Sequence, residues 1–130
     1  MLKGERGPYR DGMDPLARFR DRLSPATYED DVMTGVHDGD PRGGVWVPER
    51  LFLRLVHLAD AYDLHVTSRL GVGTVVLSRP LARSFLDEVA FVGERVDDPA
   101  LLPWLQRIAD YGEHVLRRRG DVRLTVDPHP

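Results

Sequence analysis

Residues 45–78, VWVPERLFLRLVHLADAYDLHVTSRLGVGTVVLS, decide the fold class. They begin with three β-favouring residues, 45–47, which predict a short strand. Pro48 follows and suits the first position of a helix, which the apolar periodicity extends to about Tyr62. The side of this helix that we expect to be buried consists of Leu51, Phe52, Leu55, Leu58, Ala59 and Tyr62.

Two further β-favouring runs close this stretch, residues 65–70 and 74–78. Gly71–Val72–Gly73 separates them, and a short glycine-containing loop between such runs predicts an antiparallel hairpin. The same glycines are the nearest feature to a phosphate-binding loop. Such a loop leads into a helix, however, whereas strand-like residues follow Gly73. We therefore expect a turn and no nucleotide site.

The C-terminal part predicts two adjacent helices. The first covers about 80–96, and its buried stripe is Leu81, Phe85, Val89, Val92 and Val96. Because Pro103 would break a helix that began earlier, we expect a single turn over 99–102 and a second helix over about 103–119. The apolar arc of this second helix consists of Trp104, Leu105, Ile108, Ala109, Gly112, Val115 and Leu116.

The last predicted element is a strand. Gly120 suits the position just past a helix end, where a left-handed backbone costs glycine little. Val122, Leu124 and Val126 then alternate with polar residues. Such alternation predicts a half-buried strand over 122–126.

This order of elements predicts an α+β fold: a small, mostly antiparallel sheet of about four strands with a central hairpin, packed by about three main helices. A doubly wound fold also interleaves strands and helices, but a hairpin and two adjacent helices fit it poorly. We assign residues 45–130 to the α+β core and residues 1–44 to an N-terminal extension.

The extension, residues 1–44, is crowded with Gly, Pro, Asp and Arg. A capping residue followed by proline occurs twice in it and predicts short helices over about 14–23 and 24–33. Residues 37–44, HDGDPRGG, predict a loop on composition. Whether the extension is ordered stays open, and Met13 is an alternative start of translation.

The composition excludes several classes of protein for this chain. The net charge is −3 with a pI near 5.9, and there is no cysteine, which excludes disulfides and thiolate metal sites. We find neither a signal-peptide core nor about 18 consecutive apolar residues, so we expect a cytoplasmic chain without a membrane span. Lys3 is the only lysine, Ile108 the only isoleucine, and asparagine is absent. Codons for these residues are AT-rich, which favours an origin in a GC-rich bacterial genome.

Side chains with catalytic or metal-binding chemistry lack a recognisable pattern. No two of the five histidines have the spacing of a zinc site, so we expect no metal and no cofactor. Asp87 and Glu88 are placed by the helical projection on an outer arc, where ion pairs with arginine are ordinary. A dispersed enzyme or ligand site remains the alternative, built from His37, His57, Asp87 and Glu88.

Arg117–Arg118–Arg119 is the only basic run. It falls at a predicted helix end, where positive charge complements the helix dipole. The negative net charge and the lack of interleaved aromatic residues argue against nucleic-acid binding.

Two apolar residues lie on polar arcs of their predicted helices. Leu53 projects among charged residues of the helix 48–62, and Phe91 projects among Asp87, Glu94 and other charged residues of the helix 80–96. A pair of this kind suggests a surface for a protein partner or a homodimer, formed by Leu53, Phe91, Asp87 and Glu94. Alternatively, the N-terminal segment covers this face with Leu16, Phe19 and Leu23.

Small size, acidic balance and this apolar pair favour a protein-binding module of bacterial origin. An immunity- or antitoxin-type inhibitor that acts by stoichiometric association is one form of it. The competing hypothesis is the small enzyme or ligand-binding domain with a dispersed site.

Overall fold

The computed structural model describes residues 32–128. The predicted helix over 14–23 lies outside this range, as does all but the end of the one over 24–33. Leu16, Phe19 and Leu23 lie outside it too, so their predicted contacts stay predictions.

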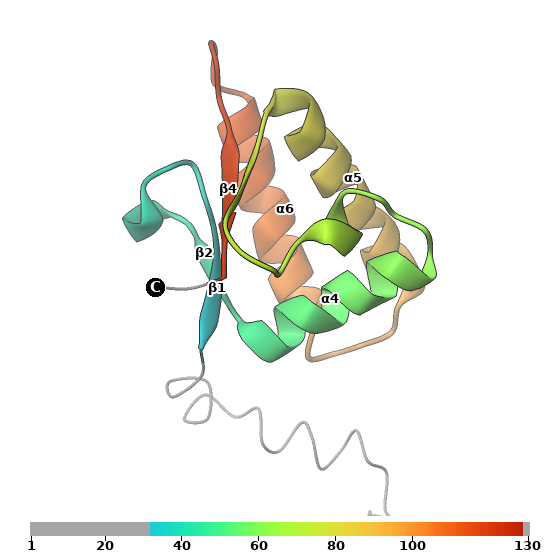
Figure 1. The fold of residues 1–130 in the computed structure, drawn as a ribbon. Coiled ribbons are helices and arrows are strands. Elements are labelled where there is room, and N and C mark those ends of the chain that lie inside the picture. The colour runs from blue at the N-terminus through green and yellow to red at the C-terminus, as the bar shows by residue number, and fades with distance from the viewer. Residues whose placement is uncertain (1–31, 129–130) are drawn as a thin grey trace, which may run out of the picture. The chain divides into compact units, whose positions relative to one another are not determined.

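The described elements intersperse strands and helices along the chain, with α5 and α6 adjacent (Figure 1). In order they are β1 (Met33–His37), the short 3-10 helix η1 (Pro41–Gly43), β2 (Val45–Pro48), α4 (Glu49–Ala61), the 3-10 helix η2 (Thr67–Arg69), β3 (Val75–Leu77), α5 (Arg79–Arg95), α6 (Leu102–Leu116) and β4 (Leu124–Asp127). The predicted strands at 45–47 and 122–126 and the three long helices are confirmed within a few residues. Among the described residues, we find no helix with the length and apolar character needed to cross a membrane.

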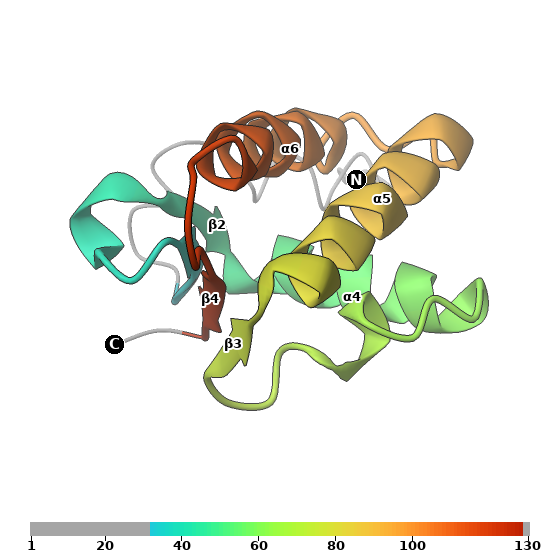
Figure 2. The same cartoon turned by 90° about the horizontal axis from the view of Figure 1, so that it is seen from above.

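The strands form one antiparallel sheet in the order β2-β1-β4-β3, which confirms the α+β class. Helices α4, α5 and α6 lie on one side of it, and the connection between β1 and β2 projects on the other (Figures 1 and 2). Directly opposed residues point to the same face, so the register defines both faces. The core face carries buried Thr34, Val36, Val47, Leu77, Leu124 and Val126.

The second face of the sheet carries Gly35, His37, Trp46, Val76, Thr125 and Asp127. Trp46 lies directly over Gly35, since a Cβ atom at residue 35 would come within 2.7 Å of the indole ring. Glycine at 35 therefore sets the position of Trp46.

The predicted central hairpin over 65–78 is wrong. Only Val75–Leu77 is a strand, and it pairs with β4, while Thr67–Arg69 is a 3-10 turn. The Glu88 carboxylate accepts hydrogen bonds from the backbone N–H groups of Thr67 (2.7 Å) and Val66 (3.3 Å). Because these donors are bound to a side chain of α5, they are not available to a strand ladder. Glu88 thus does not belong to a solvated outer arc, as the helical projection had placed it.

The hairpin of this fold comes earlier, between β1 and β2, and it replaces the predicted helix end at Met33. Strand β1 pairs with β2 on one side and β4 on the other, so residues 33–37 belong to the sheet of the core. Its sequence, MTGVH, has little β character of its own. Pairing on both sides stabilises it, and such non-local contacts leave no local signal.

Two burial predictions are also wrong. Leu81 is 47% exposed and Tyr62 42% exposed, whereas both were expected in the core. On α5 the buried residues are Ala82, Phe85, Leu86, Val89 and Val92. Leu81 lies in the first turn of α5, and Tyr62 is the residue that caps the end of α4.

Helix α6 ends at Leu116, and its free carbonyl groups bind an arginine from elsewhere in the chain. Arg79 donates to the carbonyl oxygens of Leu116 (2.6 Å), Arg118 (2.8 Å) and Gly120 (2.9 Å). Gly120 has a φ of +90°, but it lies four positions after the last residue of α6, in the connection to β4, and not directly past the helix end as predicted. This contact joins the first turn of α5 to the connection between α6 and β4.

Candidate functional site

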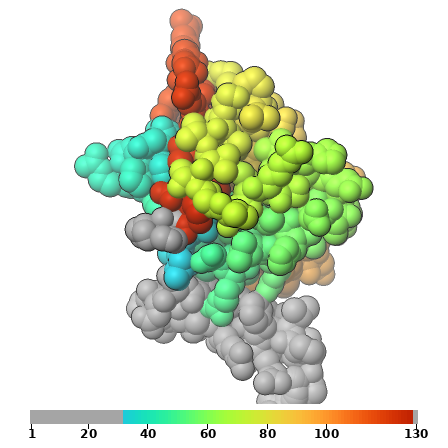
Figure 3. All heavy atoms as spheres, viewed as in Figure 1, coloured from blue at the N-terminus to red at the C-terminus, as the bar shows by residue number. Residues whose placement is uncertain are grey.

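Leu53 and Phe91, the predicted partner-binding residues, are both half-buried. Leu53 lies against the segment between α4 and β3, since a Cβ atom at Gly71 would be 3.1 Å from its Cδ2. This segment, yellow-green in Figure 3, lies across that face of the molecule. The Phe91 ring meets the ring of Tyr62 edge to face at 5.5 Å, and the Arg95 guanidinium lies 3.5 Å from its centroid.

The two residues thus contact different neighbours, and a shared partner surface stays a prediction. Phe91 contacts Tyr62, which follows Leu53 by nine positions and so lies about 13 Å further along α4. Asp87 pairs with Arg83 (3.2 Å) and Glu94 with Arg95 (3.5 Å), and both carboxylates are exposed. Exposed pairs of this kind contribute little stability and indicate no specific partner.

The residues of the dispersed-enzyme alternative are not brought together either. In the described part of the chain, no hydrogen bond or ion pair joins any two of His37, His57, Asp87 and Glu88. His57 is exposed on α4, while Glu88 binds the backbone before η2. Residues 32–128 also contain no group of three or more His, Asp or Glu side chains arranged to hold a metal ion.

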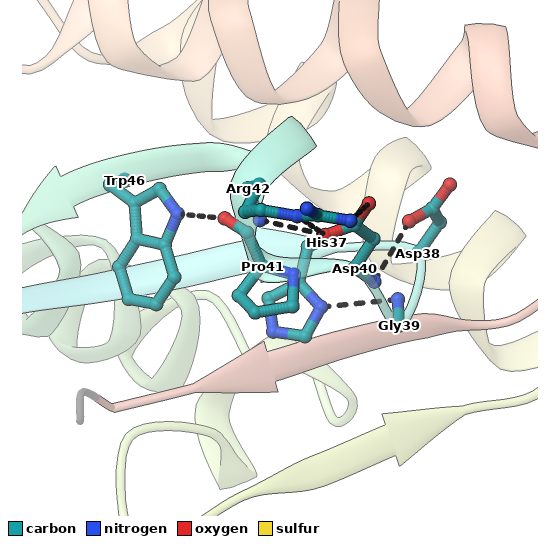
Figure 4. Close-up of polar contacts among 7 residues, drawn as sticks. All are labelled: His37, Asp38, Gly39, Asp40, Pro41, Arg42 and Trp46. Carbon is teal, nitrogen blue, oxygen red and sulfur yellow. Dashed lines mark hydrogen bonds and ion pairs between the residues drawn. The ribbon is translucent and has the colours of Figure 1, made fainter.

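His37 begins a compact turn that leads to Trp46 (Figure 4). Its Nδ1 accepts a hydrogen bond from the backbone N–H of Gly39 (3.1 Å), so the ring proton lies on Nε2 when the ring is neutral. Nε2 is 3.8 Å from Oδ2 of Asp127 on β4. The ring is 5% exposed and stacks on Trp46, with 6.0 Å between centroids. A histidine so covered acts as a structural support and not as an accessible base.

The rest of the turn is held by carboxylates that bind nearby backbone N–H groups. Asp38 accepts from the N–H of Asp40 (3.1 Å), and Asp40 accepts from the N–H of Arg42 (3.0 Å) and so caps η1. The Pro41 carbonyl accepts from the indole Nε1 of Trp46 (2.8 Å). The loop predicted for residues 37–44 is therefore ordered, and its hydrogen bonds hold the indole ring of Trp46 in place.

Contacts with α6 anchor this turn to the helical side of the molecule. Arg118 pairs with Asp38 at 2.5 Å and, with the N–H of Asp40, holds the pKa of the Asp38 carboxyl below its usual value. The hydroxyl of Tyr111 is buried nearby, and burial together with the charge of Asp38 raises its pKa. The phenol therefore stays neutral at any ordinary pH.

Between β2 and α6 lies an open groove of about 410 Å³, hereafter the aromatic groove. Its lining comes from the two elements: Gly44, Val45 and Trp46 on one wall, and Trp104, Arg107, Asp110 and Tyr111 on the other. The guanidinium of Arg107 lies over the ring of Trp104 at 4.6 Å. Both tryptophans of the chain are among its lining residues and both are half-buried, but the ring of Trp46 lies over Gly35, on the face of the sheet that points away from α6.

Sequence reasoning missed this groove. It placed Trp104 on the buried arc of its helix and treated Trp46 as a strand residue. The available signal was the spacing of Trp104, Arg107 and Tyr111, which fall on one side of a helix at i, i+3 and i+7. What stands opposite that side depends on the edge position of β2, which the sequence did not reveal.

A second hollow, of about 470 Å³, lies between α5 and α6. It is lined by Val89, Ala90, Gly93, Glu94, Leu102, Leu105, Gln106 and Ala109. Aliphatic and small residues dominate it, and it offers fewer directional groups than the aromatic groove.

Comparisons with protein-family models, curated proteins and solved structures found no match to this chain.

Proposed function

We propose that this chain is a protein-binding module that acts by stoichiometric association. The observation that carries the proposal is the aromatic groove, where two tryptophans and a tyrosine from distant parts of the chain line one open hollow. Tryptophan, tyrosine and arginine are the residues that contribute most to protein–protein binding energy when they are desolvated by a partner. The groove contains all three types.

The rigidity of the groove walls also supports binding. Trp46 is held by Gly35, His37 and the Pro41 carbonyl. A side chain already fixed in the free protein loses little conformational entropy when a partner binds, so more of the contact energy appears as affinity.

The kind of partner is a further proposal. An immunity- or antitoxin-type inhibitor from a GC-rich bacterium would be small, would carry a net negative charge and would bind its partner without catalysing a reaction. A homodimer through the same groove is the other form that association can take, and the oligomeric state of the purified chain distinguishes the two.

Capture of a partner from the native host tests the proposal. The wild-type chain is compared with Trp104→Ala, which removes one aromatic wall, and with Leu81→Ala, which removes an exposed apolar side chain outside the groove. We expect a protein that wild type and Leu81→Ala retain and Trp104→Ala loses, and that forms a complex of fixed stoichiometry when purified. Equal capture by all three chains, or no complex of defined stoichiometry, contradicts the proposal.

A further inference from the structure

The two edges of the sheet differ in how they are protected against pairing with another chain. The strand order β2-β1-β4-β3 makes β2 and β3 the edges (Figure 2). Proline and charged side chains are the usual means of preventing a further strand from adding to an edge. Strand β2 ends in Pro48, which has no N–H to offer. Residues 70–78, which contain β3, include neither proline nor an ionisable side chain.

The hydrogen-bond ladder leaves the backbone of Val76 pointing out of the sheet. Bonded pairs alternate along an antiparallel ladder, and the bond from the Glu49 N–H to the Val32 carbonyl (2.8 Å) sets their phase. Carried across the sheet through the register, this phase bonds Val75 and Leu77 to β4. The N–H and C=O groups of Val76 then point away from β4, and among the described residues no other backbone group is bonded to them.

Exposed apolar side chains accompany these two backbone groups. Val76 lies on the sheet face opposite the helices and is 52% exposed, and Val72, in the turn before β3, is 90% exposed. The segment that carries both residues, yellow-green to yellow in Figure 3, lies at the surface of the molecule. A backbone donor and acceptor beside exposed valines match the chemistry of an added β-strand.

We propose that β3 pairs antiparallel with β3 of a second copy of this chain, about a two-fold axis at Val76. The pairing joins the four-stranded sheets of the two copies into one continuous sheet. It uses a surface other than the aromatic groove and is independent of the proposed function.

Self-complementarity identifies a second copy as the occupant of this edge. A two-fold contact brings the same residues of both chains together, so a charged residue at the axis would face its like. The segment 70–78 carries no charge. Val76 of each copy donates to and accepts from Val76 of the other, which pairs both outward groups and places valine against valine.

The residues on either side of Val76 fit the same pairing. Thr74 of one copy lies opposite Ser78 of the other, and the backbone of Ser78 is still extended, with φ −64° and ψ 168°. The next residue, Arg79, carries a charge, but its guanidinium binds the carbonyl oxygens at the end of α6 and in the connection to β4. The paired segments therefore meet without opposed charges.

Sedimentation of the full chain over a dilution series tests the proposal. We expect wild type to form a dimer of the 14.7 kDa chain. Val76→Lys places two positive charges at the axis and should weaken dimerisation at least about ten-fold. Val76→Thr is the matched control, because threonine is also β-branched and carries no charge, and it should dimerise like wild type. Thermal unfolding verifies that each variant is folded.

A charge-reversal pair tests the two-fold axis itself. Val76→Glu alone should be as monomeric as Val76→Lys. A mixture of these two variants should associate at least about five-fold more tightly than either alone, because opposite charges then face each other. This recovery requires residue 76 of one copy to lie beside residue 76 of the other.

Amide hydrogen exchange tests the pairing without any substitution. In wild type the Val76 amide should be protected at high concentration and should exchange rapidly on dilution. The amides of Val75 and Leu77 bond to β4 and should stay protected at both concentrations. This measurement remains decisive if a charged residue at position 76 prevents folding.

Four outcomes would overturn the proposal: wild type is a monomer at its highest soluble concentration, Val76→Lys dimerises at full affinity, the mixed charge variants do not associate, or the Val76 amide exchanges rapidly in the dimer. A dimer that Trp104→Ala loses and Val76→Lys keeps would place the contact at the aromatic groove instead. Loss of a captured partner in Trp104→Ala tests the proposed function alone, so the two proposals fail separately.

Discussion

The α4–α5 surface, formed by Leu53, Tyr62 and Phe91, and the aromatic groove both display apolar side chains, but they differ in what covers them. On the α4–α5 surface each side chain meets a neighbour from the same chain, such as Gly71 for Leu53 and Arg95 for Phe91. The groove lies between β2 and α6, where the Arg107 guanidinium lies over the ring of Trp104, while the ring of Trp46 lies over Gly35 and stacks on His37. An apolar residue on a polar helical arc is thus weak evidence for a partner, because a neighbour from elsewhere in the same chain can cover it.

Among the variants that test this comparison, Glu88→Ala is expected to have the largest effect. Loss of the carboxylate leaves the N–H groups of Val66 and Thr67 without their acceptor and should loosen the segment that covers Leu53. We expect about 2 to 3 kcal/mol lower free energy of unfolding. Chemical denaturation measures it, with Asp87→Ala as the exposed control, expected within about 0.5 kcal/mol. Equal effects at both positions would contradict a specific role for Glu88.

Gly35→Ala should damage the groove more than the α4–α5 surface. The new methyl group would come within 2.7 Å of the Trp46 ring, which must leave its stack on His37 and its bond to Pro41. We expect a loss of about 2 kcal/mol and a red shift of tryptophan emission. Gly43→Ala is the matched control, because nothing lies within 4 Å of a Cβ there. Unchanged emission in Gly35→Ala would show that Trp46 does not depend on this glycine.

Phe91→Ala tests whether the α4–α5 surface is structural. Phe91 is half-buried against Tyr62 and Arg95, so about 1 to 2 kcal/mol of stability should be lost, below the 3 to 5 kcal/mol of a fully buried ring. Association with a partner should stay intact. A Phe91→Ala variant that keeps its stability but no longer associates with a partner would identify Phe91 as a binding residue and contradict a purely structural α4–α5 surface.

The smallest effect is expected for the ion pair between Arg118 and Asp38, which anchors the turn over residues 37–44. The pKa of Asp38 is lowered by Arg118, so this pair contributes stability above the unfolded value of about 3.9, and that contribution is lost as pH falls through the lower folded value. Arg118→Ala should cost about 0.5 to 1 kcal/mol at neutral pH, and the difference from wild type should shrink below about pH 4. Arg119→Ala serves as control, and a pH-independent difference would contradict the role of Asp38.

The parts of the fold that sequence reasoning predicted share one property: their signals are local. Helices α4, α5 and α6 follow from apolar periodicity and from prolines at their starts, and β4 from alternation. The single turn predicted over 99–102 is present too, and there Asp98 accepts hydrogen bonds from the N–H groups of Ala100 and Leu101. Each of these features depends on residues within a few positions of one another.

The parts that sequence reasoning missed depend on distant partners. Strand β1 exists because β2 and β4 pair with it, and residues 66–67 bend because Glu88, about twenty positions later, binds their backbone. The candidate site belongs to this second group. Trp46 and Trp104 are far apart in the chain, and the helical projection gave one of them to the core.

The sequence by itself determined the class of the fold, the three long helices and the absence of thiolate chemistry, because periodicity and composition act locally. Only the tertiary structure decided which neighbour each apolar side chain packs against. The physical reason is that the exposure of a side chain is set by what stands opposite it. For Leu53, Phe91 and Trp46 the opposite residue comes from another element of the chain.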